Sequence, residues 1–94
     1  MPPRGFEWDD VKARGNNGKH GLTFEVASRA FFDPLKVIVD DDREDYGEDR
    51  WNCIVMVAGH VLLVCYTMRG SNVRIISARR ADRDEQDTYF VENG

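Results

Sequence analysis

The strongest constraint on the fold is a run of three apolar segments that follow one another closely in the second half of the chain. Trp51–Val57, His60–Thr67 and Asn72–Ala78 are rich in β-branched and aromatic residues, which favour extended strands. Only Ala58-Gly59 separates the first two segments, and Arg69-Gly70-Ser71 precedes the third. Because such short glycine-containing connections join antiparallel neighbours, the three segments predict an antiparallel sheet.

The first third of the chain carries the start and stop signals of two helices. Asp9 or Asp10 can accept hydrogen bonds from the free amides of a first helical turn, in a helix that runs to about Lys19. Thr23 can cap a second helix in the same way. That helix is expected to end at Asp33-Pro34, because the residue before a proline avoids helical angles.

Two more strands and a last helix complete the predicted order. Leu35–Val39 is apolar and β-branched, and the short aromatic Phe6-Glu7-Trp8 suits an edge strand. Asp82 and Glu85 have the spacing of a capping box, which predicts a helix to about Val91. The order (β)ααββββα indicates an α+β domain, with an antiparallel sheet of four to five strands, two N-terminal helices and one C-terminal helix. The length of 94 residues suits one domain over 1–94, in which residues 1–5 are expected to be disordered or extended.

A strand register follows if Met68 faces Asn72 across the second turn. This register predicts three further pairs on one sheet face: Tyr66 with Arg74, Val64 with Ile76, and His60 with Arg80. Val73 and Ile75 would then lie on the opposite face. Both faces are apolar, so we expect the two long helices to cover one and either the last helix or a partner chain to cover the other.

The cysteines and the hydropathy pattern indicate a cytoplasmic protein. Cys53 and Cys65 would point to opposite faces of the sheet, where no disulfide can close, and two such cysteines read as small buried residues in a reducing compartment. No apolar run approaches the roughly 20 residues that span a bilayer. The N-terminus lacks the apolar segment of a secretion signal. These features exclude a membrane protein and a disulfide scaffold.

Charge is divided unevenly along the chain. The net charge of −4 argues against direct nucleic-acid binding. Acidic residues gather between Asp40 and Asp49, however, and arginines gather between Gly59 and Arg83. The acidic stretch is either a solvated loop beside ordinary surface arginines or a docking site for a basic segment of a partner.

Two basic groups could carry chemistry on RNA. Lys12, Lys19 and His20 lie on the first predicted helix, where lysine can hold a phosphate and histidine can transfer a proton; the alternative is a helix end that favours positive charge. The second group surrounds the last predicted strands and consists of Tyr66, Arg69, Arg74, Arg79 and Arg80.

Metal-free phosphodiester cleavage needs a base, an acid and a group that stabilises the doubly negative phosphorane. Arginine suits the last task, because its guanidinium matches phosphate oxygens in two-point contacts. His20 or Tyr66 could transfer protons, Tyr66 only if arginines lower its pKa. Alternatively, the arginines pair with the acidic loop. The sequence lacks calcium, zinc, Walker and Rossmann motifs, so no metal or other cofactor is expected.

These motifs together resemble the BrnT family of bacterial type II toxins. The resemblance covers about residues 6 to 89 and is carried by Phe6-Glu7-Trp8-Asp9, Lys19-His20-Gly21, Tyr66-Thr67, Arg69 and Arg74-Ile75-Ile76-Ser77-Ala78-Arg79. It implies a RelE-like fold and a ribonuclease toxin that cleaves RNA and arrests translation. By motif matching, the candidate catalytic residues are His20, Arg69, Arg79 and Arg80, and the candidate substrate-binding residues are Lys12, Lys19, Tyr66 and Arg74.

The same resemblance implies a BrnA-type ribbon-helix-helix antitoxin as partner. The complex would bind operator DNA only through the antitoxin, which agrees with the acidic net charge of this chain. A toxin dimer within a hetero-oligomer stays open. So does the alternative that this chain is a catalytically inactive antitoxin-binding module that acts as co-repressor.

Overall fold

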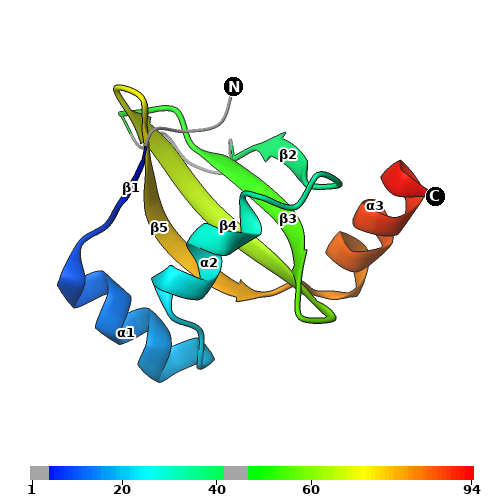
Figure 1. Cartoon of the computed structure of the whole chain (residues 1–94), viewed down its shortest axis with the longest axis horizontal. Coiled ribbons are helices and arrows are strands. Elements are labelled where there is room, and N and C mark those ends of the chain that lie inside the picture. Colours follow the sequence, from blue (N-terminus) through cyan, green and yellow to red (C-terminus); the bar gives the residue numbers. More distant parts are fainter. Residues whose placement is uncertain (1–4, 42–46) are drawn as a thin grey trace.

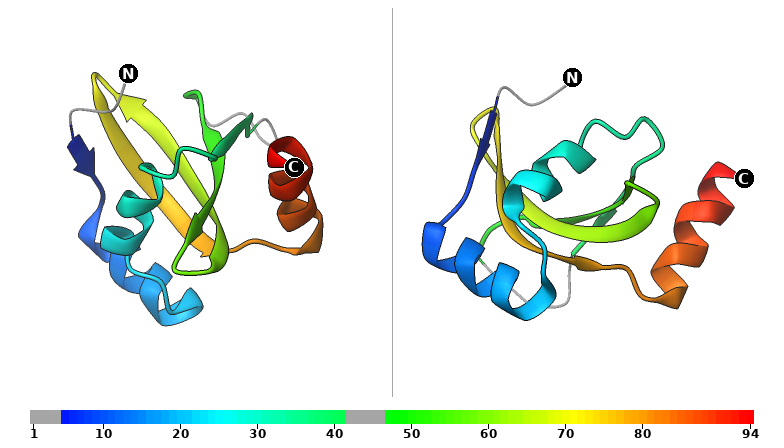
Figure 2. Two further views of the ribbon diagram at one scale, coloured as in Figure 1. Left: turned by 45° about the vertical axis from the view of Figure 1, so that its right-hand side comes forward. Right: turned by 60° about the horizontal axis from the view of Figure 1, so that its bottom comes forward.

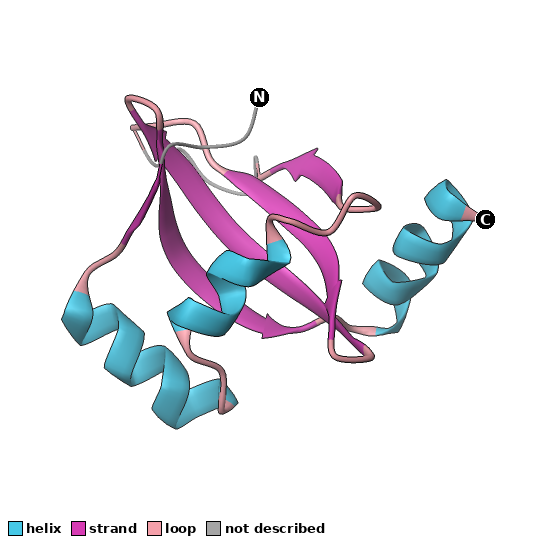
Figure 3. Cartoon of the chain, in the orientation of Figure 1, coloured by secondary structure: helices cyan, strands magenta, loops and turns pink. Residues whose placement is uncertain are grey.

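Five strands and three helices follow one another in the computed structural model of the chain, which describes residues 5–41 and 47–94 (Figures 1 and 3). In chain order they are β1 (Gly5–Glu7), α1 (Asp10–His20), α2 (Phe24–Ala30), β2 (Val37–Asp40), β3 (Trp51–Val57), β4 (His60–Arg69), β5 (Asn72–Arg80) and α3 (Arg83–Asn93). This confirms the predicted α+β order. The RelE-like label stays a prediction. None of the described helices is long and apolar enough to cross a membrane.

The sheet is mixed, with the strand order β1-β5-β4-β3-β2. Strands β2 to β5 are antiparallel neighbours as predicted, but β1 runs parallel to β5, with Phe6 opposite Val73. The expectation of a purely antiparallel sheet was therefore wrong. No hairpin links β1 to β5, since helices and three strands separate them in the chain, so connection length does not dictate their relative direction.

The capping signals in the sequence act as predicted. Asp9 accepts hydrogen bonds from Val11 N at 2.8 Å and from Lys12 N at 3.1 Å, at the start of α1. Thr23 accepts one from Val26 N at the start of α2. At α3 the Asp82 side chain and the Glu85 side chain each bond the other residue's backbone amide, which forms the complete capping box.

Several predicted segment boundaries shift in the structure. The second helix ends at Ala30, before the expected Asp33-Pro34, and β4 and β5 each extend two residues further than expected, to Arg69 and Arg80. The strand expected at Leu35–Val39 is Val37–Asp40, because Asp33 holds a turn in which its carboxylate accepts from Leu35 N and its carbonyl accepts from Lys36 N. Of the expected N-terminal tail 1–5, residues 1–4 lie outside the described residues, and Gly5 already belongs to β1. Residues 42–46 of the expected acidic loop also lie outside the described residues.

The β3–β4 hairpin has the predicted register and the β4–β5 hairpin does not. Val57 lies opposite His60, and the two residues between them both have positive φ, 51° at Ala58 and 81° at Gly59, as a type I′ turn requires. In the second hairpin Arg69, not Met68, lies opposite Asn72.

Two local features explain the error in the second hairpin. The turn contains two residues instead of three, with Gly70 at a φ of 60°. An irregularity next to Cys65 and Tyr66 then shifts the pairing by one more residue. The pairs found are Thr67 with Arg74, Tyr66 with Ile75, Cys65 with Ser77, Val64 with Ala78, Leu63 with Arg79, and Leu62 with Arg80. Because a slip of one residue exchanges the two faces, Arg74 does not share a face with Tyr66.

Each sheet face has its own apolar cluster, and helices cover both (Figure 2). The larger cluster lies under α1 and α2 and includes Phe24, Val64, Tyr66 and Ile75. Ile75 was predicted on the opposite face and lies here because of the register shift. The smaller cluster lies under α3 and consists of Ile54, Val61, Leu63, Ala81 and Tyr89. Of the two alternatives, the last helix therefore covers this part of the second face.

The cysteines agree with the prediction. Cys53 and Cys65 are both buried, and they form no disulfide with each other. Cys53 belongs to the cluster under α1 and α2, and Cys65 lies two residues from Leu63 on β4, which places it on the α3 face. Burial raises the pKa of the Cys53 thiol to about 12, so that thiol stays protonated.

Candidate functional site

Three of the predicted arginines lie on the sheet face that α3 partly covers, which we call the α3 face. Arg74 lies directly opposite Thr67, and Arg69 lies two residues further along the same strand as Thr67. Arg79 lies opposite Leu63, a residue of the cluster under α3. Since side chains alternate along a strand, these pairings place the three guanidinium groups on the same face of the sheet.

Each of these guanidinium groups contacts a glutamate from a different segment. Arg69 Nη2 lies 3.4 Å from Glu48 Oε1, and Arg74 Nη1 lies 3.3 Å from Glu7 Oε1. The pairing of Arg69 with Glu48 is the kind of contact with the acidic stretch that the sequence left open as an alternative. The α3 face is therefore a row of arginine–glutamate pairs and not a purely positive surface.

Arg79 has the tightest of these contacts. Its Nη1 and Nη2 atoms donate to the two carboxylate oxygens of Glu85 at 2.8 and 2.9 Å. Glu85 Oε1 also accepts from the backbone amide of Asp82 at 2.9 Å. The capping box of α3 thereby fixes the guanidinium of Arg79 at the end of β5, and such a two-point contact restricts the orientation of an arginine.

Arg80 lies on the other face of the sheet. It is opposite Leu62, which belongs to the cluster under α1 and α2, and its Nη1 lies 3.2 Å from His60 Nδ1. A small cavity of about 110 Å³ lies here and is lined by Leu22, Val26, Val57, Ala58, His60, Leu62 and Arg80. Arg79 and Arg80 are adjacent in β5, so their side chains lie on opposite faces at the same end of the strand.

The lysine–histidine group lies near that same end. The side chain of Asn16 bonds the backbone of Ala78, two residues before Arg80. His20 lies one helical turn beyond Asn16 at the end of α1, where the chain turns through Gly21 in the left-handed conformation. His20 is therefore at the Arg80 end of β5, whereas Lys12 lies in the first turn of α1.

The candidate arginines are distributed over both faces of the sheet. Arg79 and the α1 end lie on opposite sides of the sheet, with Arg79 held by Glu85. Arg69 lies seven residues along β4 from Leu62, the partner of Arg80, which corresponds to about 23 Å of strand. The candidate arginines are thus divided between the two faces, because side chains alternate along β5, and between the two ends of the β4–β5 hairpin.

Tyr66 is a core residue in this structure. It is buried, and its ring centroid lies 4.9 Å from that of Phe31 and 5.7 Å from that of Trp51. Burial raises the pKa of the Tyr66 hydroxyl to about 12. This is opposite to the lowered pKa that a role as proton acceptor requires, and Tyr66 supports the sheet instead.

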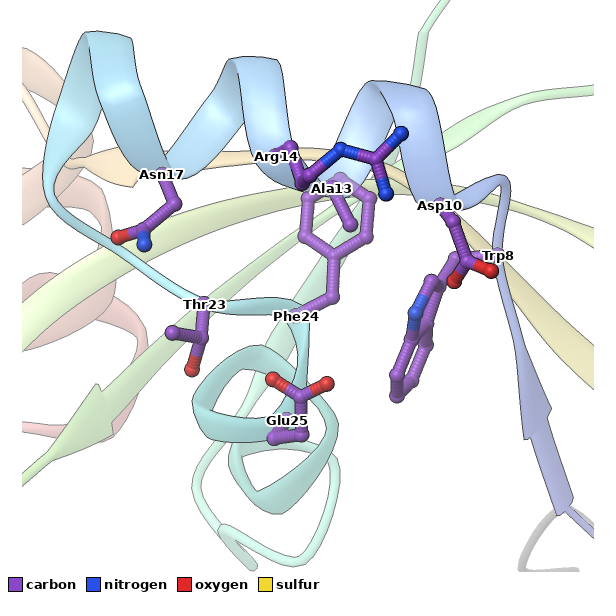
Figure 4. A pocket seen from close by; sticks show the side chains of 8 residues that line it. All are labelled: Trp8, Asp10, Ala13, Arg14, Asn17, Thr23, Phe24 and Glu25. Carbon is purple, nitrogen blue, oxygen red and sulfur yellow. The ribbon is translucent and has the colours of Figure 1, made fainter.

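A separate pocket of about 210 Å³ lies between α1 and α2 (Figure 4). It is lined by Trp8, Asp10, Ala13, Arg14, Asn17, Thr23, Phe24 and Glu25, none of which is a predicted site residue. The charged side chains at its rim are one guanidinium and two carboxylates. This mixture does not match the repeated positive charge that an RNA backbone requires.

The contacts of Arg79 with Glu85 and of Arg74 with Glu7 were not predicted from the sequence. Glu85 was predicted as a capping residue and Glu7 as part of an edge strand. The spacing within each local motif gave no signal for these contacts, since Glu7 and Arg74 are 67 positions apart. Within residues 5–41 and 47–94, no group of three or more histidine, cysteine, aspartate or glutamate side chains could hold a metal ion.

Comparison with known protein families gives one match. The family model described as "Ribonuclease toxin, BrnT, of type II toxin-antitoxin system" matches residues 8–85. The matched region extends from the start of α1 through Glu85 and includes every candidate site residue. No curated protein matches the chain.

Proposed function

Because the chain belongs to the BrnT family of ribonuclease toxins of type II toxin-antitoxin systems, we propose that it is an endoribonuclease that cleaves RNA without a metal ion and thereby inhibits translation. The family match over residues 8–85 is the observation that carries this proposal. Translation takes place in the bacterial cytoplasm, so the toxin is expected to act there.

The arginines of β4 and β5 support contact with an RNA strand. Arg69, Arg74 and Arg79 lie on one face along an extended stretch of sheet, which suits the repeated charges of a single-stranded backbone. The guanidinium of Arg79 donates to Glu85 and to the backbone carbonyl of Arg80. Phosphate oxygens are acceptors of the same kind and can compete with Glu85 for this guanidinium.

Cleavage is assigned to the end of β5. Arg79 on one face and Arg80 on the other can stabilise a phosphorane, and His20 at the end of α1 can transfer a proton. Arg69 lies at the other end of β4, so its proposed catalytic role rests on motif matching alone. Arg74, Lys12 and Lys19 are proposed to bind the substrate.

The partner is proposed to be a BrnA-type ribbon-helix-helix antitoxin. Type II systems pair a toxin with an antitoxin, and the net charge of −4 on this chain disfavours direct contact with operator DNA. The antitoxin would therefore supply the DNA contact, and the toxin would act as co-repressor, as a single copy or as a dimer within the hetero-oligomer.

Expression in bacteria tests the ribonuclease activity. Wild type is expected to arrest growth and fragment RNA, and Arg79→Ala to slow cleavage by the purified chain about 100-fold, as does the loss of one preorganised donor to a transition state. Arg29→Ala removes an exposed arginine of α2 and is the matched control with unchanged cleavage. Normal growth and intact RNA with abundant soluble wild type would refute the activity. Loss of cleavage in the presence of a chelator would refute metal independence.

A second function is favoured by the pairing of all three arginines on the α3 face. Glu48, Glu7 and Glu85 already compensate these charges, as in an antitoxin-binding co-repressor without activity. This alternative predicts a tight complex with the antitoxin, operator repression by that complex, and no RNA cleavage by the separated toxin.

A further inference from the structure

The outer edge of β2 ends the sheet without a neighbouring strand among the described residues. β2 pairs with β3 on one side only. A strand edge presents unpaired backbone donors and acceptors, which makes it a template for another strand. The side chains at this edge are apolar, and Ile38 and Val39 are 47% and 39% exposed. β2 contains no proline, and its first three residues, Val37, Ile38 and Val39, carry no charge that would oppose pairing.

We propose that β2 pairs antiparallel with β2 of a second copy of this chain, with Ile38 opposite Ile38 across a two-fold axis. In this register Val37 lies opposite Val39 of the second copy, and Lys36 lies opposite Asp40. Two-fold symmetry makes both contacts occur twice. The segment from Lys36 to Asp40 is thus complementary to itself in charge and in hydrophobicity.

The charges select this register over its neighbour. A shift by one residue would place Lys36 opposite Asp41, whose side chain is buried and already accepts from Cys65 Sγ at 3.5 Å. The same shift would set the apolar Val37 opposite Asp40. In the proposed register, Lys36 and Asp40 are both exposed, and neither has an ion pair within the described part of the chain.

The packing of the sheet agrees with this assignment. Ile38 lies opposite Cys53 and Asp40 opposite Trp51, so Lys36, Ile38 and Asp40 belong to one face by alternation. Cross-strand pairs on one face interact directly, which brings Lys36 within reach of Asp40 of the second copy. Because the paired strands are short, the interface is small, and we expect a weak dimer that forms at about micromolar concentration.

This dimer is independent of the proposed ribonuclease activity. Strands β4 and β3 lie between β5 and β2 in the sheet order β1-β5-β4-β3-β2. Dimerisation through β2 therefore leaves Arg79 and Arg80 accessible. A monomeric chain that cleaves RNA would refute only the dimer, and a dimeric chain that does not cleave would refute only the activity.

The test measures the mass of the purified full chain by light scattering and sedimentation across a dilution series under reducing conditions. Wild type is expected to approach twice the 10.8 kDa monomer mass at high concentration. Ile38→Lys places two lysines together at the axis and is expected to give a monomer. Val91→Lys changes a residue of α3 that is 77% exposed and serves as the matched control that still dimerises.

A charge exchange tests the register itself. Lys36→Asp and Asp40→Lys each create two like-charge pairs and are expected to weaken dimerisation about tenfold or more. The double variant restores opposite charges across the axis and is expected to recover the wild-type dissociation constant. A double variant no better than either single variant would overturn the register. A wild type that stays at the monomer mass of 10.8 kDa throughout the dilution series would overturn the dimer. This conclusion would hold even if Ile38→Lys abolished antitoxin binding, a result that would assign the edge of β2 to the antitoxin.

Discussion

Replacement of Asn16 by alanine is expected to destabilise the fold strongly, because this side chain completes the edge of β5. β1 pairs with β5 only from Asn72 to Arg74, so the later part of β5 has no neighbouring strand on that side among the described residues. At Ala78 the buried amide of Asn16 takes the place of a strand. Its Nδ2 donates to Ala78 O at 2.8 Å, and its Oδ1 accepts from Ala78 N at 3.0 Å. Nδ2 also donates to Leu22 O at 3.1 Å.

The expected magnitude follows from the groups left without partners. Ala78 is fully buried, so Asn16→Ala would leave both its N–H and its C=O unsatisfied. Each such group costs about 1–3 kcal/mol, which gives a loss of about 3 kcal/mol in the free energy of unfolding. For a domain of this size, that loss lowers the melting temperature by roughly 10–20 °C.

The matched control is Asn17→Ala, one position further on the same helix. Asn17 is exposed, so its replacement changes helix propensity by the same amount as the replacement of Asn16 and removes no buried hydrogen bond. The free energy of unfolding of both variants is measured by urea denaturation and thermal melts. The difference between the two variants isolates the contribution of the buried hydrogen bonds. A difference below about 1 kcal/mol would refute the argument from unsatisfied groups.

Three further predictions concern the turn before β4 and the hydrogen bond that Tyr89 of α3 donates to Asp33. Ala58 adopts a φ of 51° in a type I′ turn, which is strained for alanine and favourable for asparagine, so Ala58→Asn is expected to add about 0.5–1 kcal/mol of stability; an unchanged or lower melting temperature would contradict this. Partial burial alone would raise the pKa of Asp33, but hydrogen bonds from Met56 N, Leu35 N and the Tyr89 hydroxyl hold that pKa below its ordinary value. A carboxylate with a lowered folded pKa stabilises above its unfolded value, and this contribution is lost as the pH falls through the folded pKa. Urea midpoints measured from about pH 6 to about pH 2 should thus fall less in Asp33→Asn than in wild type, and Tyr89→Phe should cost about 1 kcal/mol at neutral pH.

Most of the secondary structure could be predicted because its signals are local. Asp9, Thr23 and Asp82 cap their helices through amides two or three residues away. The hairpin at Ala58 and Gly59 depends on two adjacent residues with positive φ. Such contacts are made within one turn of chain, so residue types at fixed offsets suffice to recognise them.

The candidate site could be predicted only as a set of residue types. The arginines of β4 and β5 stood out in the sequence, yet their distribution between the faces depended on the register. The shorter turn at Gly70 and the irregularity beside Tyr66 moved Arg74 to the α3 face and Ile75 into the core. A single residue of slip decides such assignments, and local propensity does not fix it.

The sequence by itself determined the order of the elements, their caps and turns, and the family to which the motifs point. The tertiary structure alone decided that β1 runs parallel to β5, that Asn16 completes a strand 62 positions away, and which face of the sheet Arg79 and Arg80 each occupy. The physical reason is the range of the interactions. Capping and turn formation involve neighbouring residues, whereas register, edge pairing and the glutamate partners of the arginines arise only when distant segments pack against one another.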